Sequence, residues 1–315
     1  MVYDIDGNVI CNDDGGGGTT HPDAQCTQAF LDYMAKKCTQ YGMSGTHYAS
    51  PSGLTESSYS TPQDLMKLGI ATTSYHEALA VWATPSQSFP IKGDHARTLS
   101  VSNNVISGIG TMMQSAGYKF LGGKGGSLIY SDRHKAQLYL VDIQGVPVIL
   151  SLMGLGATSY DSIYQAAVDL ADMVNASLNG QTPTESETLQ QFVADSGGYA
   201  ACLVPNVPGC YANLESPAEF LTREHSLSAS PTVSRYPAST SKTMTVLCAL
   251  DYIMNIHETI TVKTVDIVGG SGSTFYNGDQ LTMYDALRIM MMESNNTLAN
   301  TIARTIGDKI LTYGV

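Results

Sequence analysis

The spacing of apolar residues predicts helices in the first part of the chain. Residues 22–42 repeat Phe30, Met34 and Cys38 every four positions, so these side chains share one face of a helix. A second helix is expected to begin at Thr61-Pro-Gln-Asp64, which combines a cap, a first-turn proline and an acidic first turn.

The pattern changes to strands around residues 118–154. Leu138–Val141 and Val146–Leu150 flank a glycine-containing turn, which predicts a β-hairpin. Helical spacing returns over Tyr160–Leu178, where apolar side chains again recur every three or four positions. The polar run Asn179–Thr188 reads as a surface linker.

The last part of the chain mixes both patterns. Tyr199–Val204 and Cys210–Leu214 are predicted to be strands joined by a proline and glycine turn. A helix is expected from about Ser239, and Thr282-Met-Tyr-Asp285 has the spacing of a capping box that opens a helix leading to Ser294.

The first twenty residues are predicted to form a hairpin and a glycine-rich segment. Two short apolar runs flank Asp6-Gly7, a strong turn pair. Asp4, Asp6 and Asn8 also resemble the first ligands of a calcium loop. Neither the glycine nor the closing glutamate of such a loop follows, so the hairpin is favoured.

Composition excludes some classes of protein. The 315 residues carry a net charge of -12, which argues against binding to nucleic acid or to anionic lipid. The start of the chain lacks the basic and then apolar pattern of a signal peptide. We therefore expect either a cytoplasmic protein or an export signal outside this sequence.

Six cysteines leave the redox compartment open. No pair has C-x-x-C spacing, so zinc is not expected, and neither is a cofactor. Cys202 and Cys210 could form a bridge across a hairpin if the protein is exported. The others are interpreted as small apolar residues.

Ser239-Thr-Ser-Lys242 is the strongest chemical signal in the chain. A serine and a lysine three residues apart share one face of a helix. A lysine that is partly stripped of water can take the proton of a serine hydroxyl and make it a nucleophile. Taken alone, the pattern is most often a solvated helix face.

Two further motifs would complete a site for acyl transfer. Ser294-Asn-Asn296 can supply a relay hydroxyl and an amide, and Lys124-Gly125-Gly126 can supply a cation beside two glycines. The backbone N–H groups of Ser239 and of Ser127, just past Gly126, would form an oxyanion hole. Alone, these motifs are usually a helix end and a loop.

Around these motifs, the sequence resembles the penicillin-binding serine D-alanyl-D-alanine carboxypeptidases, the low-molecular-mass penicillin-binding proteins. Residues 237–245 are similar to the family's nucleophile segment, and residues 281–296 to its second motif with the preceding helix. Thr46–Leu54 and Ser60–Asp64 resemble a characteristic loop and the helix start after it. Residues 102–104 and 122–124 lead into the third motif.

The order of these segments differs from that of the family. The family runs from nucleophile to second motif, loop, third motif and final helix, whereas here the loop, third motif and final helix come first. A circular permutation accounts for this order, with the family's original ends joined through Asn179–Thr188. The ends of compact domains often lie close together, which makes such a rearrangement feasible.

The resemblance implies an α+β fold of the β-lactamase and DD-peptidase type, circularly permuted: a five-stranded antiparallel sheet flanked by helices, plus an all-helical lobe. The expected divisions are 1–20, hairpin and glycine-rich segment; 21–100, part of the helical lobe; 101–178, sheet with third motif and final helix; 179–197, linker; 198–255, strands and nucleophile helix; 256–315, rest of the lobe with the second motif.

The resemblance also implies a function. Ser239, Lys242 and Ser294 would be catalytic. A peptidoglycan stem peptide ending in D-Ala-D-Ala would be bound by Asn296, Lys124, Gly125, Gly126 and the backbone of Ser127. Covalent binding of β-lactams and a location outside the cytoplasm are implied as well. A serine β-lactamase or esterase, or a catalytically weak peptidoglycan-binding scaffold, are the alternatives.

One position departs from the family pattern. Gly125 stands where the third motif usually has a threonine or serine whose hydroxyl helps to hold the substrate's carboxylate. Weaker binding, another substrate or lost activity could each follow, and Ser127 or Ser102 could replace the hydroxyl. His47, Trp82 and Met290–Met292 are interpreted as structural rather than catalytic.

Overall fold

The computed structural model describes residues 2–3, 9–11, 20–128, 134–154, 160–204 and 227–314. Strands β1 (Val2–Tyr3) and β2 (Val9–Cys11) pair in antiparallel fashion, as the predicted hairpin requires. The turn between them, the acidic residues compared with a calcium loop and the glycine-rich segment lie outside the described residues.

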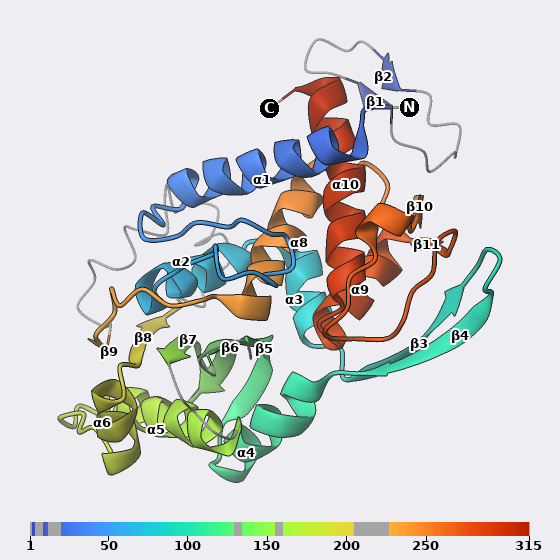
Figure 1. Ribbon diagram of the computed structural model, residues 1–315. Helices are drawn as coiled ribbons and strands as arrows, with labels where there is room; N and C mark the ends of the chain where they lie inside the picture. The colour runs from blue at the N-terminus through green and yellow to red at the C-terminus, as the bar shows by residue number, and fades with distance from the viewer. Residues whose placement is uncertain are drawn as a thin grey trace.

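A five-stranded antiparallel sheet forms the centre of the fold (Figure 1). Its strands lie in the order β5–β6–β7–β8–β9, so β5 is at one edge. The strands are β5 (Lys119–Leu128), β6 (His134–Ile143), β7 (Val146–Gly154), β8 (Gly198–Leu203) and β9 (Leu227–Ala229). The expected α+β class with a five-stranded sheet is therefore confirmed. The strand predicted at Cys210–Leu214 lies outside the described residues.

Side chains alternate between the two faces of the sheet along each strand, and both faces are buried. Leu138 and Leu140 of β6 join a core with the helical lobe, whereas Tyr139 and Val141 join a second core on the opposite face. The second face is covered by α5 (Tyr160–Leu178) with α4 (Thr111–Ser115) and α6 (Glu187–Ala194), as Figure 1 shows.

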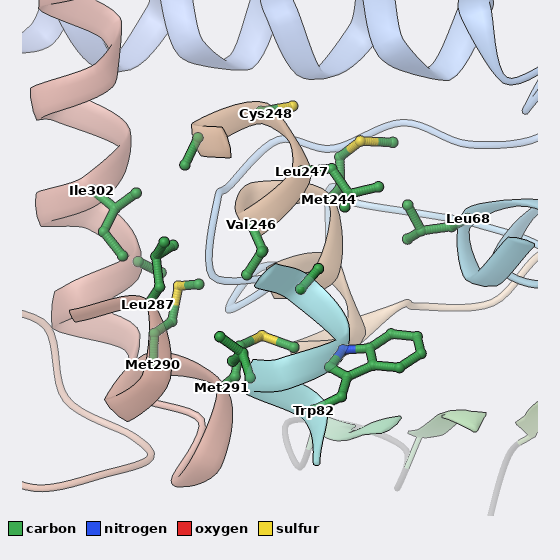
Figure 2. Packing of buried hydrophobic residues seen from close by; sticks show 14 of the residues in the cluster. Leu68, Trp82, Met244, Val246, Leu247, Cys248, Leu287, Met290, Met291 and Ile302 are labelled. Atoms are coloured by element: carbon green, nitrogen blue, oxygen red, sulfur yellow. The ribbon is translucent and has the colours of Figure 1, made fainter. Parts of the chain in front are cut away.

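The helical lobe lies on the other face of the sheet (Figure 1). Its helices are α1 (Asp23–Gln40), α2 (Pro62–Thr72), α3 (His76–Trp82), α8 (Ser241–Tyr252), α9 (Met283–Met292) and α10 (Asn296–Tyr313). The predicted caps are present, since Thr61 accepts a hydrogen bond from the Asp64 amide and Thr282 from the Asp285 amide. Trp82, Met290 and Met291 point into the core between these helices (Figure 2), as expected.

The range 21–100 also contains strands that the sequence did not predict. Strands β3 (Ser86–Ile91) and β4 (Arg97–Ser102) form a hairpin that projects from the lobe (Figure 1). Most of its side chains are exposed or half-buried, and only three are buried, so the alternating apolar signal is weak. Shorter elements complete the fold: η1 (Ile106–Gly110), η2 (Ala238–Thr240), β10 (Thr259–Thr261), η3 (Thr264–Asp266) and β11 (Gln280–Thr282).

The start of α1 lies against the last turns of α10. The backbone amides of Thr20 and His21 donate to Asp308 Oδ1 over 2.8 and 2.9 Å. A Cβ atom added at Gly307 would overlap the carbonyl oxygen of Cys26, so the two helices meet at backbone distance. Segments that are almost three hundred residues apart in the chain are therefore neighbours.

Cys26, Cys38 and Cys248 are free and buried, in line with their interpretation as apolar residues. Burial raises the pKa of the Cys38 thiol to about 12. The proposed Cys202–Cys210 bridge falls partly outside the described residues and stays a prediction. Within the described ranges, every helix is too short or too polar to cross a membrane.

Candidate active site

The predicted nucleophile lies where a short 3-10 turn runs into a helix. Ser239 is the middle residue of η2, and α8 begins two residues later. Ala238 immediately before it has φ of 48°, in the left-handed region that residues other than glycine rarely adopt. Such strained positions concentrate at functional sites.

Two glycines from separate segments press against this turn. A Cβ atom at Gly126 of β5 would lie 2.7 Å from the Ser239 amide nitrogen, which is closer than real Cβ contacts allow. A Cβ atom at Gly53, in the loop before α2, would overlap the carbonyl oxygen of Ala238. The turn that carries Ser239 is thus held between two backbones, and only glycine permits either approach.

Lys242 is fully buried and has three oxygen neighbours. Its Nζ lies 3.0 Å from Ser239 Oγ, 2.8 Å from the carbonyl oxygen of Ser52 and 2.7 Å from Asn296 Oδ1. Three different segments therefore converge on one amine. The side chains of Ser239 and Lys242 meet because three residues make almost one turn of helix.

Ser294 is paired with Lys124 rather than with Lys242. Lys124 Nζ lies 3.0 Å from Ser294 Oγ and 2.6 Å from the carbonyl oxygen of Gly125. Ser294 sits between α9 and α10 with φ of 63°, again in the left-handed region. This conformation turns its hydroxyl toward β5, while Asn296 two residues later turns toward Lys242.

Burial lowers the pKa of both lysines. Lys242 has a pKa well below its usual value, chiefly because the site is desolvated and also because of the positive charge of Lys124. Desolvation lowers the pKa of Lys124 to about 7. Both effects favour the neutral form of Lys242, which is the form that can accept a proton.

The three motifs identified in the sequence therefore meet at one place. Residues 205–312, which contain the first two of them, match the model of a family described as the β-lactamase enzyme family. The match supports a serine hydrolase of the β-lactamase and penicillin-binding superfamily. Neither a curated protein nor a solved structure matches the chain. The α+β architecture is consistent with a β-lactamase-like fold.

The position of Gly125 is explained by a neighbouring strand. Gly125 pairs with Gln137 of β6, and a Cβ atom added at Gly125 would lie 2.7 Å from Gln137 Oε1. Gln137 is fully buried, and its Oε1 accepts a hydrogen bond from Tyr139. The Gln137 amide therefore occupies the space that a side chain at position 125 would need.

Ser127 is the next residue on β5 after Gly126, at the point where the strand passes the Ser239 turn. The Gly126 backbone lies against the Ser239 amide, and the part of the Ser127 amide in an oxyanion hole stays a prediction. His47 pairs with Tyr59 through backbone hydrogen bonds. It is not among the three hydrogen-bonding partners of Lys242, which are Ser52, Ser239 and Asn296.

Sequence reasoning missed the parts of the site that consist of backbone. The Ser52 carbonyl on Lys242 and the Gly269 carbonyl, which accepts from Asn296 Nδ2 over 3.1 Å, carry no residue-type signal. Gly53 belongs to the loop Thr46–Leu54, and the resemblance of this loop to the family is the one sequence signal that points to its place beside the nucleophile. Across the described residues, no cluster of side chains suited to a metal ion is found.

Proposed function

We propose that the protein is a serine-type D-alanyl-D-alanine carboxypeptidase that binds penicillin and acts on peptidoglycan stem peptides through an acyl-enzyme. The observation that supports this most is the position of Lys242, a buried amine with a lowered pKa beside Ser239. Ser294 and Lys124 supply the hydroxyl and cation that release of an amine and recognition of a carboxylate require.

The two oxygen acceptors on Lys242 orient its lone pair. A neutral amine has two N–H bonds, and Ser52 O and Asn296 Oδ1 accept one each. The remaining lone pair then points to Ser239 Oγ, 3.0 Å away. Ser239 can transfer its proton to Lys242 as its oxygen forms a bond to the substrate carbonyl carbon.

Collapse of the tetrahedral intermediate breaks the bond between the carbonyl carbon and the nitrogen of the terminal D-alanine. The departing amine takes a proton from Ser294, and the Lys124 ammonium group, which donates to Ser294 Oγ over 3.0 Å, can replace it. Lys124 as a cation lies beside Ser294 and would attract the terminal carboxylate. Water then attacks the ester on Ser239 and releases the shortened peptide.

The oxyanion hole would consist of the Ser239 amide and the amide of Ser127. Their closeness depends on Gly126, where any side chain would collide with the Ser239 amide. Backbone donors held in fixed positions stabilise negative charge without reorganising during the reaction.

A serine β-lactamase of the same fold is the second candidate, favoured by the description of the matching family. Fast deacylation in a β-lactamase needs a base near the acyl ester. The loop before α2 instead places a backbone carbonyl on Lys242, and within the described residues no carboxylate is hydrogen-bonded to Ser239 or Lys242. This arrangement favours a slowly released acyl-enzyme.

We also propose that the order of elements is a circular permutation of the family order. In that order α1 would follow α10 directly, and the contact of Thr20 and His21 with Asp308 supports this.

A site that acts on peptidoglycan would lie outside the cytoplasm. Gly125 supports a further possibility, a weak catalyst that mainly binds peptidoglycan.

Intact-mass analysis after incubation with penicillin tests the proposal. We expect one adduct of the antibiotic's mass, lost in Ser239→Ala and kept in the matched control Ser241→Ala. The Ser241 hydroxyl is buried and makes no hydrogen bond within the described structure. D-alanine release from a pentapeptide ending in D-Ala-D-Ala would complete the assignment.

Other results would contradict the assignment. Rapid nitrocefin hydrolysis without a lasting adduct would indicate a β-lactamase. Absence of any adduct with a penicillin, a cephalosporin and a carbapenem would contradict an active serine hydrolase.

A further inference from the structure

The residues on either side of Ser294 bind a single loop. We define the second-motif segment as residues 293–297 and the covering loop as residues 268–273. Asn296 Nδ2 donates to Gly269 O over 3.1 Å, and Thr297 Oγ1 donates to Val268 O over 3.1 Å. Close contacts accompany these bonds, since a Cβ atom at Gly270 would lie 2.6 Å from Asn296 Nδ2.

Glu293 anchors the other end of this loop. Its carboxylate accepts from the Ser273 amide over 2.8 Å and from the Ser273 hydroxyl over 2.7 Å. It also accepts from Asn295 Nδ2 over 2.9 Å, and the same nitrogen donates to Ser273 O over 2.8 Å. Hydrogen bonds to an ionised carboxylate are stronger than those between neutral groups.

The covering loop determines which way the Asn296 amide faces. An asparagine amide has one accepting oxygen and one donating nitrogen. Because Nδ2 donates to Gly269 O, the oxygen Oδ1 must face Lys242 Nζ, 2.7 Å away. A flipped amide would set two donors against each other and remove one of the two acceptors that orient the Lys242 lone pair.

From these contacts we propose that Glu293 is a positioning residue for acylation. Its carboxylate holds the covering loop against the second-motif segment, and the loop fixes the Asn296 amide and thereby the direction of the Lys242 amine. Glu293 does not contact Lys242 or Ser239 itself in this network. This inference rests on the proposed function, because it assigns Lys242 the role of base.

The chain offers a control in the same stretch. Asn277 Oδ1 accepts from the amide and hydroxyl of Thr264 over 3.0 and 3.1 Å, on a turn that does not contact the second-motif segment through these bonds. Asn277→Ala removes a comparable polar anchor close to the covering loop. It should therefore destabilise the protein without altering the Asn296 amide.

The test compares Glu293→Ala, Glu293→Gln and Asn277→Ala by acylation with a fluorescent penicillin between pH 5 and 10. We expect Glu293→Ala to lower the acylation rate constant at saturating penicillin at least tenfold and to change the shape of its pH profile. Glu293→Gln, which keeps an oxygen for Ser273, should recover part of the rate. Asn277→Ala should keep both the wild-type rate and profile.

Hydrogen exchange supplies a readout that does not need activity. Glu293→Ala should speed amide exchange in residues 268–273 and 294–297, and Asn277→Ala should not. If Glu293→Ala does not fold, Ser273→Ala removes one of the same bonds and should give a smaller change in the same direction.

Equal rates, profiles and exchange in the Glu293 and Asn277 variants would overturn this inference. Such a result would leave the proposed function intact as long as the wild-type protein is acylated. A wild-type protein that forms no adduct would instead contradict the proposed function, while exchange would still show whether Glu293 holds the loop.

Discussion

Asn296 Oδ1 lies 2.7 Å from Lys242 Nζ, and both side chains are buried. Asn296→Asp would put a negative charge at this distance and raise the pKa of Lys242. We expect the rising limb of the acylation profile to move to higher pH by at least one unit. The rate at pH 7 should fall at least tenfold, and an unchanged profile would exclude Lys242 as the base.

The lowered pKa of Lys124 predicts that carboxylate binding weakens as the pH rises. Desolvation lowers its pKa to about 7, so the cation is present below this value and disappears above it. The apparent affinity for a penicillin should fall as the pH rises through about 7, whereas affinity for its methyl ester should not. Lys124→Met should remove the difference between acid and ester. Equal pH dependence for both ligands would show that the carboxylate is held elsewhere.

Much of the site could be predicted from the sequence because side-chain chemistry leaves a residue pattern. Ser239, Lys242 and Ser294 are such residues, and helical spacing brought the first two together. The Ser52 carbonyl could not be predicted, because every residue has one and only the folded loop aims it at Lys242. The hairpin of β3 and β4 was missed for a related reason, since few of its side chains are buried.

Gly125 and Gln137 should show strong coupling. In Gly125→Thr the new side chain would meet Gln137 Oε1, and overpacking of this kind typically costs about 1–3 kcal/mol. Gln137→Ala opens the space, so the double variant should regain stability relative to Gly125→Thr and bind carboxylates more tightly than the wild type. Urea unfolding of all four proteins measures the coupling, and simple additivity would contradict the contact.

Gly307 should be indispensable for the contact between α1 and α10. A methyl group there would overlap the carbonyl oxygen of Cys26, so Gly307→Ala should destabilise the protein by about 2 kcal/mol or more. Thr312→Ala, on the exposed end of the same helix, should change stability by less than about 0.5 kcal/mol. Thermal unfolding measures the stability of both variants. Equal decreases in the melting temperature would mean that the two helices separate readily.

The proposed permutation predicts that the family order can be restored. Residue 314 would be joined to residue 20 by a short linker, and the chain would be opened after Gly180. Residue 20 already contacts Asp308 near the end of α10, so a few residues suffice to close the gap. The rearranged protein should fold and bind penicillin at the wild-type rate. A folded but inactive product would contradict the permutation, and circular dichroism with penicillin labelling separates these outcomes.

The two glycines that press against the Ser239 turn also affect the thermodynamics of the reaction. Gly53 and Gly126 confine this turn between two backbones before any substrate arrives. The conformational entropy of the nucleophile is therefore lost when the chain folds, and little remains to be lost when a substrate binds. Replacing either glycine would move that entropic cost from folding to catalysis, even in a variant whose side chains at the site were unchanged.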